Sequence, residues 1–424
     1  MTDHLSQRRA RVGRAWQDLD GVVLIASGAV VPVPGGADQT YPFLAHSDYY
    51  YLTEVDRPGR VLAHDPQEGE EGWVDFAPPI TLDDRIWEGR EGDEPARPIT
   101  ELSDWLDRRA GRRLALLGAP IEGRDAHSEL SDTAQQALDR VRRIKDEHEM
   151  GLIRRAVEAT AAAFAKLPAL LVAGTTERRV KVELEAEFFR HGGDSTGYGS
   201  IVGSGPNAAV FHFDPGERTL REGEVVLIDA GAQIRRYTAD VTRTFGVGGE
   251  LTGPMREIYD IVLRAQKKAV DKCRPGVEWR DIHFGAAADM TRGLIDMGLL
   301  KGAADDLVAR DVHALFFPHG VGHMVGLGVR DASGYLPGRE RSRRFGLSFL
   351  RMDLPLEPGH VVTVEPGLYF SPALLRDPVR REAFGEDVNW DMAERLIGLG
   401  GVRIEDNLRI TDGAPENLTA MIGK

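Results

Sequence analysis

The chain has 424 residues, of which 42% are hydrophobic, and it carries a formal net charge of −14. This length accommodates two or three domains, and the apolar content is typical of a soluble globular protein. The negative charge argues against nucleic acid or an anionic membrane as the main partner, and no apolar run is long enough to predict a membrane-spanning helix. The single cysteine, Cys273, excludes internal disulfides and cysteine-based metal sites, so we expect a protein of a reducing compartment, the cytoplasm.

The first 148 residues are predicted to form a small α/β domain, because strand-like and helical segments alternate there. A helix is expected at 6–19, and acidic, Gly-rich exposed loops at 68–72 and 88–98. The expected strands are 21–26, 61–63, 73–77 and 113–117. An aromatic stretch, YPFLAHSDYYYLT (41–53), contains His46 and Asp48. Residues 131–167 show helical spacing, interrupted by the charged segment 142–150, and we place the domain boundary after residue 148.

Residues 149–424 are predicted to form a larger α+β domain, because runs of strands accompany packed helices. Helices are expected at 176–190, 254–273 and 279–297. Strands are expected at 200–203, 209–213, 225–228, 241–245, 361–364, 368–370 and 402–404.

Two aspartates dominate the segment VVLIDAGAQIRRYTADVTRTF (225–245). Asp229 ends an apolar run, and Asp240 lies in a second β-rich run. A hairpin with its turn centred between Ile234 and Arg235 would make the two aspartates a direct cross-strand pair, with Cβ atoms roughly 5 Å apart. Carboxylates this close repel unless they are protonated or bridged by cations. The alternative is two solvated acids that flank a turn.

Two histidines and two glutamates further along the chain are candidates to extend this set. HGVGH holds His319 and His323 in a glycine-rich segment, where we expect a loop or strand rather than a helix. Glu365 and Glu405 each end an apolar run, a place where a glutamate is often only the first exposed residue. Together, four acids and one imidazole suit two hard divalent ions. Mn²⁺ is the natural choice, and Co²⁺ or Zn²⁺ would also fit.

Four segments, DAGAQIRRYTADVTRTF, HGVGHMVGLGV, VVTVEPGLYF and GGVRIEDN, resemble the motifs of the pita-bread metallopeptidases. The sequence is most similar to Xaa-Pro dipeptidases (prolidases) and aminopeptidase P, over residues 142–417. The resemblance implies an α+β fold, with a pita-bread catalytic domain (149–424) behind a smaller creatinase-like α/β domain (1–148). It also implies that two metals are held by Asp229, Asp240, His323, Glu365 and Glu405, with Asp240 and Glu405 bridging them.

The resemblance also implies roles for individual positions. Glu365 would be the general base, and His212 and His319 would assist at the scissile bond. Tyr198 falls where the family has an active-site tyrosine, and Arg403 where an arginine supports the metal-binding acids beside the substrate. Arg351 falls where prolidases keep an arginine for the terminal carboxylate of the substrate, and we expect a buried or half-buried guanidinium there.

One position departs from the family pattern. The family reads V-H-D where this chain has Val329-Arg330-Asp331, so Arg330 replaces a histidine that contacts substrate. An arginine can bind a carboxylate through two hydrogen bonds, which would favour recognition of a peptide C-terminus. The Arg-rich segment 338–351 is either a lid or a solvated charge run.

We therefore expect an enzyme that hydrolyses the Xaa-Pro bond of small proline-containing peptides, foremost a dipeptidase, acting as a homodimer. The nearest alternative is aminopeptidase P, which acts on longer peptides. Two other hypotheses concern different classes of protein. One is a non-catalytic member of the fold that binds peptides, and the other is a metal-free creatinase-type enzyme. The complete ligand set argues against both.

Overall fold

The computed structural model describes residues 3–90, 92 and 95–424. The chain divides into two compact units, Met1–Arg142 and Arg143–Lys424, whereas the domain boundary expected after residue 148 stays a prediction. Within the described residues, no helix combines the length and the hydropathy that a membrane crossing requires.

The first unit is built on one mixed sheet with the strand order β4-β3-β2-β1-β5. Strand β1 pairs with β2 antiparallel and with β5 parallel. Its strands are β1 (Val22–Ala26), β2 (Val61–His64), β3 (Trp73–Ala77), β4 (Arg97–Pro98) and β5 (Leu114–Gly118). Its helices are α1 (Asp3–Ala15), α2 (Ser47–Thr53), α3 (Leu82–Trp87), α4 (Leu102–Asp107) and α5 (Ser128–Arg143), which ends at the division between the units. The strands expected from the sequence are all present in this sheet.

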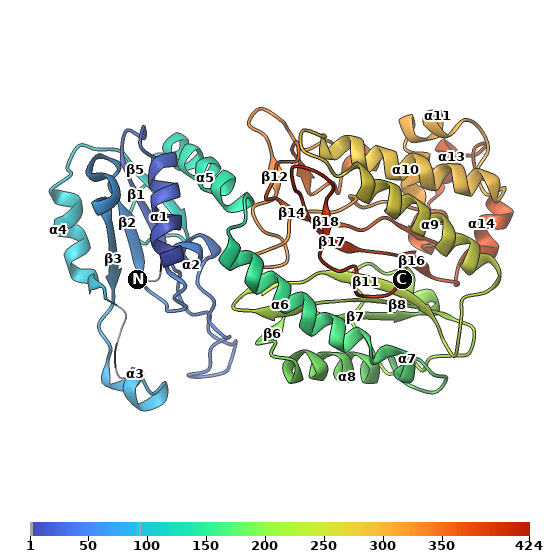
Figure 1. Ribbon diagram of the computed structural model, residues 1–424, viewed down its shortest axis with the longest axis horizontal. Coiled ribbons are helices and arrows are strands. Elements are labelled where there is room, and N and C mark those ends of the chain that lie inside the picture. Colours follow the sequence, from blue (N-terminus) through green and yellow to red (C-terminus); the bar gives the residue numbers. More distant parts are fainter. Residues whose placement is uncertain (1–2, 91, 93–94) are drawn as a thin grey trace. The chain divides into compact units, whose positions relative to one another are not determined.

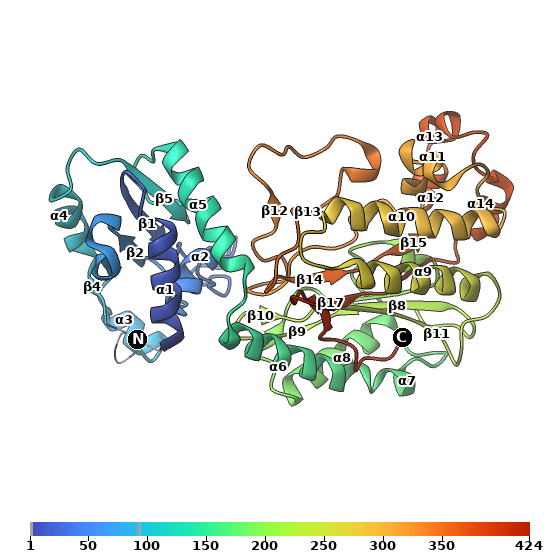
Figure 2. The same cartoon turned by 45° about the horizontal axis from the view of Figure 1, so that its top comes forward.

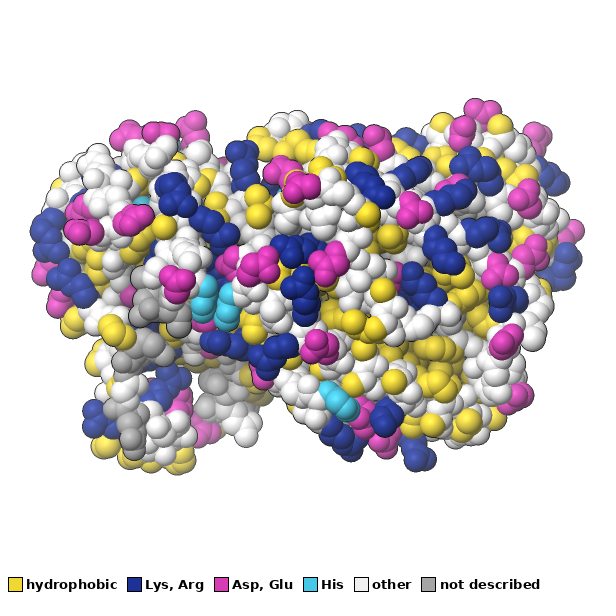
Figure 3. Space-filling view, viewed as in Figure 1, with side chains coloured by type: hydrophobic (Ala, Val, Ile, Leu, Met, Phe, Trp, Pro, Cys, Tyr) yellow, Lys and Arg dark blue, Asp and Glu magenta, His cyan; other side chains and the backbone are white. Residues whose placement is uncertain are grey.

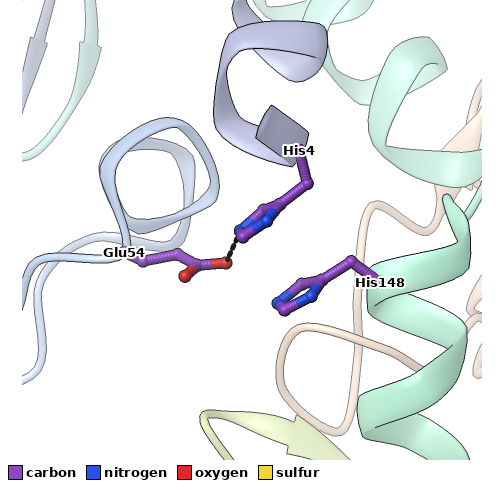
Figure 4. A group of neighbouring side chains, drawn as sticks. All are labelled: His4, Glu54 and His148. Atoms are coloured by element: carbon purple, nitrogen blue, oxygen red, sulfur yellow. Dashed lines mark hydrogen bonds and ion pairs between the residues drawn. The ribbon is translucent and has the colours of Figure 1, made fainter. Parts of the chain in front are cut away.

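The residue that caps α2 also contacts α1. Helix α1 stops at Ala15 rather than at residue 19, and α2 occupies the second half of the aromatic stretch. Glu54 caps α2 with a left-handed backbone conformation (φ 55°), and its Oε1 lies 2.9 Å from His4 Nε2 of α1 (Figure 4). Asp48 in α2 forms a buried ion pair with Arg142.

One of the two expected exposed loops has helical structure. Residues 68–72 lie in a 3₁₀ segment, Pro66–Gly72, that begins with Asp65 as its N-cap. The other, 88–98, lies partly outside the described residues, and its end forms the short strand β4.

The second unit contains helices on both sides of several small sheets (Figures 1 and 2). Its helices are α6 (Glu147–Phe164), α7 (Leu167–Leu170), α8 (Glu177–Arg190), α9 (Gly253–Lys272), α10 (Trp279–Asp296), α11 (Ala304–Ala309), α12 (Pro372–Leu375), α13 (Pro378–Ala383) and α14 (Trp390–Leu396). Its first strands are β6 (Ser195–Thr196), β7 (Ile201–Ser204), β8 (Val225–Ala230), β9 (Ala232–Ile234), β10 (Tyr237–Thr238) and β11 (Val241–Gly246). The later ones are β12 (Gly334–Tyr335), β13 (Met352–Asp353), β14 (Val361–Val364), β15 (Gly367–Tyr369), β16 (Gly401–Arg403), β17 (Asp406–Arg409) and β18 (Glu416–Asn417).

Strand β8 is buried on both faces, which explains its uninterrupted apolar sequence. Val225 and Leu227 pack into the core that contains residues of α9 and α10. Val226 and Ile228 pack into a second core with residues of α6 and α8. Figures 1 and 2 show the two helix pairs on opposite sides of the strands. The odd-numbered Asp229 therefore points to the same side as Val225 and Leu227.

The hairpin that carries the two aspartates is displaced by one residue from the expected register. Arg235 and Arg236 both have positive φ, 47° and 70°, which is typical of a two-residue type I′ turn. Tyr237 consequently pairs with Ile234, and Thr242 rather than Asp240 lies opposite Asp229. The prediction of a direct Asp229–Asp240 pair was wrong.

Two aspects of this hairpin still bring the aspartates to one site. Asp240 lies two residues from Thr242 along the same strand direction, and side chains two residues apart share a face of a sheet. The backbones approach closely at Gly231, where a Cβ atom would lie 1.8 Å from the carbonyl oxygen of Ala239. Only glycine fits at this position of the DAGA segment.

One strand expectation in this unit was wrong. Residues 209–213 were predicted as a strand, but a 3₁₀ segment, Gly205–Ala209, is followed by irregular chain. Apolar residues at 209–211 suggested burial, whereas Val210 is 50% exposed and Phe211 faces a cavity instead of a sheet.

Figure 3 shows basic and acidic side chains interspersed over the face drawn, without a continuous field of either sign.

Candidate metal centre

One cavity of about 610 Å³ in the second unit is lined by every residue that the sequence predicted for the site. These residues are Tyr198, His212, Asp229, Asp240, His319, His323, Arg330, Arg351, Glu365, Arg403 and Glu405. We call Asp229, Asp240, His323, Glu365 and Glu405 the acid cluster, and His212, Arg330 and Arg351 the basic rim. The acid cluster is buried or nearly so, whereas all three residues of the basic rim are exposed.

The two aspartates meet at one tyrosine hydroxyl. Tyr198 OH lies 2.6 Å from Asp229 Oδ1 and 2.6 Å from Asp240 Oδ1. A hydroxyl has a single proton and can donate to only one carboxylate at a time. The hydroxyl therefore holds the two carboxylates next to each other while donating to one of them at a time. The pair has the proximity that the sequence predicted, although by a different register.

His323 presents Nε2 to the acids because its other nitrogen is occupied. Nδ1 lies 2.9 Å from the carbonyl oxygen of Met324, so Nδ1 carries the proton and Nε2 keeps its lone pair. Nε2 is 3.5 Å from Asp240 Oδ2 and 3.7 Å from Glu365 Oε1. A metal-binding histidine typically has its second nitrogen held in this way.

The His323 segment is irregular chain, as its glycines predicted. At Gly322 a Cβ atom would lie 2.2 Å from the carbonyl oxygen of Thr363, so the loop can lie against β14 only without a side chain there. The backbone N–H of His323 donates to Thr363 Oγ1. This contact places His323 next to the strand that leads to Glu365.

Glu365 follows directly on β14, and Glu405 lies between β16 and β17. Glu405 is only 1% exposed, and its Oε2 accepts a 2.6 Å hydrogen bond from Thr242 Oγ1 on β11. Ligand atoms of Asp240, His323 and Glu405 all lie within 4.8 Å of one another. Val402 and Ile404 pack into the core while Arg403 and Glu405 take the other face, as expected from their alternation. Both faces of this segment are buried, so Glu405 is not merely the first exposed residue after a strand.

The electrostatics of the acid cluster fit divalent cations. Burial, followed by the charges of the neighbouring carboxylates, raises the pKa of Asp240 and of Glu405 well above the usual range. Burial also raises the pKa of Glu365 to about 7. Such shifts mean that burial and the neighbouring carboxylates disfavour the charged forms of these groups. Hard divalent ions prefer carboxylate oxygens and imidazole nitrogen, so the residues present fit such a group.

Arg403 is the buried cation behind the cluster. Its Nη2 donates to Asp229 Oδ2 at 2.5 Å, its Nε to Thr242 Oγ1 at 3.0 Å, and its Nη1 to Tyr369 OH at 3.0 Å. All of its nitrogens thus bind protein groups. Three of its five N–H groups are used in these bonds, so Arg403 supports the acids and also lines the cavity.

Tyr369 is a site residue that the sequence reasoning missed. Its hydroxyl accepts from Arg403 and lies 2.8 Å from His319 Nε2, while His319 Nδ1 lies 2.8 Å from the carbonyl oxygen of Gly320. Burial lowers the pKa of His319 to about 3, so this imidazole is neutral, with its proton on Nδ1. The sequence contains a signal for this residue, because Tyr369 follows Glu365 in the strand-like segment EPGLYF.

The basic rim differs from expectation in its exposure. Arg351 was expected to be buried or half-buried, but it is exposed, as is Arg330. Desolvation and the positive charge of Arg330 lower the pKa of His212. The rim therefore combines two guanidinium groups with an imidazole that is neutral at neutral pH.

The Arg-rich segment 338–351 is tied to the second unit by specific contacts rather than being a purely solvated charge run. Arg339 forms an ion pair with Glu278 at 2.6 Å, and Arg344 with Asp311 at 2.8 Å. Arg341 donates to the carbonyl oxygen of Ser348. Phe349 and Arg351, at the end of this segment, line the cavity.

Apolar side chains complete the cavity walls. They are Ile201, Phe211, Phe213, Pro318, Val329 and Phe349. Phe211 contacts the ring of Tyr369 edge to face, with centroids 4.7 Å apart. The cavity thus joins a charged interior to a wall that can pack against apolar parts of a ligand.

Comparisons with known proteins give one consistent picture. Residues 151–412 match the family model of metallopeptidase family M24, and residues 5–104 match the model of the aminopeptidase P N-terminal domain. The Xaa-Pro aminopeptidase of Escherichia coli is 32% identical over 427 residues, covering 93% of this chain and 90% of that protein. A probable Xaa-Pro aminopeptidase of Aspergillus clavatus is 32% identical over 408 residues, covering 90% of this chain and 86% of that protein.

Solved structures agree over the whole chain. Proline aminopeptidase P II from Yersinia pestis has a TM-score of 0.79 at 30% identity and covers 100% of this chain and 97% of its own. The Pseudomonas aeruginosa aminopeptidase PepP has a TM-score of 0.80 at 28% identity, with coverage of 100% and 96%.

These findings confirm the expected architecture, an aminopeptidase P-type N-terminal domain followed by a pita-bread catalytic domain. They also confirm an enzyme of the metallopeptidase class. They favour the aminopeptidase P alternative over the dipeptidase that we expected first. This chain belongs to metallopeptidase family M24.

Proposed function

We propose that this protein is a Xaa-Pro aminopeptidase, which removes the first residue from peptides whose second residue is proline. The observation that carries the proposal is the acid cluster, five ligand-type side chains gathered at one cavity with apolar walls. The relatives named above support the substrate class. A solved structure of E. coli aminopeptidase P contains the inhibitor Pro-Leu, and a zinc-substituted form of that enzyme was solved with product.

We assign the metal-binding role to the acid cluster. Asp229, Asp240, His323, Glu365 and Glu405 would hold two divalent ions, with Mn²⁺ as the first candidate and Co²⁺ or Zn²⁺ as alternatives. When bound, the ions would lower the pKa of a water molecule and polarise the scissile carbonyl group. The carboxylates of the cluster outnumber the one buried arginine, Arg403, and two divalent ions would offset this surplus of negative charge.

Glu365 is our candidate for the proton carrier. Its carboxylate lies in the cavity beside His323, and burial favours its protonated form. A group poised near neutral pH can accept a proton during attack on the carbonyl and return it to the departing amine. Arg403 and Thr242 hold the neighbouring acids in place, and Tyr369 holds His319.

The two imidazoles differ in what they can offer. Both nitrogens of His319 are engaged within the protein, so His319 would shape the site and make polar contact with the substrate only by exchanging a partner. His212 is exposed at the rim and could donate a hydrogen bond to the carbonyl oxygen of a bound peptide. Phe211, Phe213 and Phe349 would pack against the proline ring and the first side chain.

The dipeptidase remains the second candidate because of one feature, the exposed guanidinium groups of Arg330 and Arg351 in the cavity. The deciding experiment compares initial rates for matched Xaa-Pro dipeptides, Xaa-Pro-Xaa tripeptides and longer peptides with Mn²⁺ added. We expect hydrolysis of tripeptides and longer peptides at the Xaa-Pro bond. Hydrolysis confined to dipeptides would overturn the aminopeptidase proposal.

A further inference from the structure

Asp240 lies at a break between two strands of the hairpin that carries the aspartates. Strand β10 ends at Thr238 and β11 begins at Val241, so Asp240 belongs to neither strand. Ala239 donates its backbone N–H to Ala232 across the hairpin. Residues of an antiparallel pair alternate between facing the partner strand and facing away, so the N–H and C=O of Asp240 point away from this partner. Asp240 is only 4% exposed, and buried backbone groups need hydrogen-bond partners from elsewhere in the chain.

The side chain of Asn407 supplies both partners. Its Oδ1 accepts a 3.0 Å hydrogen bond from the N–H of Asp240, and its Nδ2 donates to the C=O of Asp240 at 2.5 Å. A carboxamide offers an acceptor and a donor side by side, as a peptide group does. Asn407 is fully buried. Its side chain therefore takes the place that a neighbouring strand would occupy beside Asp240.

The backbone of Asn407 links the same residue to two other ligand segments. Asn407 lies in β17, opposite Thr363 of β14. Thr363 donates its N–H to the carbonyl oxygen of His323 and accepts the N–H of His323 at its Oγ1. Glu405 lies two residues before Asn407, and its N–H donates to a carbonyl oxygen of β11. The segments that carry Asp240, His323 and Glu405 therefore meet at Asn407.

The same three ligand residues form a compact group, since their ligand atoms all lie within 4.8 Å of one another. Partners that orient metal ligands contribute to metal affinity although they do not touch the ion. We propose that Asn407 is a positioning residue of the metal centre, which fixes Asp240 relative to His323 and Glu405. The inference rests on the proposed metal-binding function of the acid cluster, and it adds the residue that aligns the cluster.

Binding of Mn²⁺ to the metal-stripped protein, measured by isothermal titration calorimetry, tests this role. Asn407→Ala removes both hydrogen bonds to Asp240 and should weaken Mn²⁺ binding by at least about tenfold, the scale for partners that orient metal ligands. Asn407→Thr suits a strand and should fold more readily. Its single hydroxyl group cannot replace the donor and the acceptor at both positions, so Mn²⁺ binding should still weaken by at least about threefold.

The matched control is Asn417→Ala on the neighbouring strand β18. Asn417 also uses its carboxamide inside this sheet, donating to Asp406 Oδ2 at 2.9 Å and accepting from the N–H of Thr419 at 3.0 Å. These bonds are to residues outside the acid cluster, so the control should leave the Mn²⁺ affinity close to that of the parent protein. Circular dichroism establishes that each variant is folded, and thermal melting without metal measures the general cost of each change.

Parent-like Mn²⁺ affinity in either folded Asn407 variant would overturn the positioning role, as would an equal loss of affinity in Asn417→Ala. Hydrolysis of Xaa-Pro peptides is assayed separately in the parent protein. Binding of Mn²⁺ without such hydrolysis overturns the proposed function alone. Hydrolysis by the parent protein together with unchanged Mn²⁺ affinity in the Asn407 variants overturns the positioning role alone.

Discussion

The acid cluster and the basic rim line the same cavity but are built in opposite ways. The acids are buried, and Arg403, Thr242, Tyr198 and Asn407 bind their side chains or adjacent backbone groups. The arginines of the rim are exposed and have no such partners within the described residues. The contrast indicates that the two regions have different roles in stability and in substrate binding. The buried acids should couple metal binding, folding and the chemical step, whereas the rim should change only which peptides bind.

Metal removal is the largest perturbation of the acid cluster. Chelation should abolish hydrolysis, and metal analysis of the reloaded, fully active protein should give two equivalents per chain. The buried acids also predict the pH dependence of the metal-free protein. Since the folded-state pKa of Glu365 is raised from 4.5 to about 7, the folded state binds more protons than the unfolded state between these values, and stability is lost as the pH rises through this window.

Thermal melting of the metal-free protein across this pH window measures the loss of stability. Bound metal should make this loss smaller. The Glu365→Gln variant cannot titrate at this position and should show a shallower pH dependence. Full activity with one metal equivalent or with none would contradict the assignment of the cluster.

Glu365→Gln should have the next largest effect on turnover. The change keeps the shape of the side chain but removes a ligand charge and the proposed proton carrier, so kcat should fall by roughly 10²–10⁴-fold. The variant should still fold, because a repelling charge is lost. Steady-state kinetics beside an exposed control, Glu250→Gln, check this. Near-normal turnover would show that another group carries the proton.

Arg403→Met tests the support behind the cluster. It leaves Asp229 and Tyr369 without their buried donor, and breaking a buried ion pair from one side typically costs about 3–5 kcal/mol. Urea unfolding of the metal-free protein measures the change in the free energy of unfolding. Arg409→Met, which removes a surface ion pair with Glu147, is the control and should cost at most about 1 kcal/mol. Equal costs would mean that Arg403 is not an essential buried partner.

Tyr369→Phe is a smaller change within the same network. It removes one hydroxyl group that bridges Arg403 and His319, and an unsatisfied buried partner costs about 1–3 kcal/mol. We expect a moderate fall in kcat with little change in KM for matched peptides. A change confined to KM would indicate that Tyr369 belongs with the substrate-selecting residues.

Arg351→Met should have the smallest effect on the protein itself. Since the side chain is exposed and unpaired within the described residues, the free energy of unfolding should change by no more than about 0.5 kcal/mol. Activity on a peptide without any carboxylate should stay close to that of the parent protein. A large loss of stability would erase the distinction between the rim and the acid cluster.

Much of the architecture followed from local patterns. The apolar run at 225–228 correctly predicted β8, because a strand buried on both faces needs a continuous apolar sequence. The run at 361–364, in which only Thr363 is polar, correctly predicted β14. The segment 209–213 failed because Phe211 and Phe213 line a cavity and Val210 is exposed, a difference that local pattern does not record. The missed role of Tyr369 has a similar origin, since its hydroxyl acts through Arg403, 34 positions away in the sequence.

The residue types of the site and their order could be recognised in the sequence because four segments resemble the motifs of the pita-bread metallopeptidases. An acid at the end of an apolar strand is by itself often only the first exposed residue. How these residues meet depends on contacts between distant segments. The type I′ turn at Arg235–Arg236 shifted the register of the two aspartates, and Tyr198 brings their oxygens together from outside the hairpin. Folding also selects which arginines are partnered, burying Arg403 among acceptors and leaving Arg330 and Arg351 exposed. The charge of an arginine follows from the sequence, whereas the acceptor that it binds depends on which distant segments the fold brings beside it.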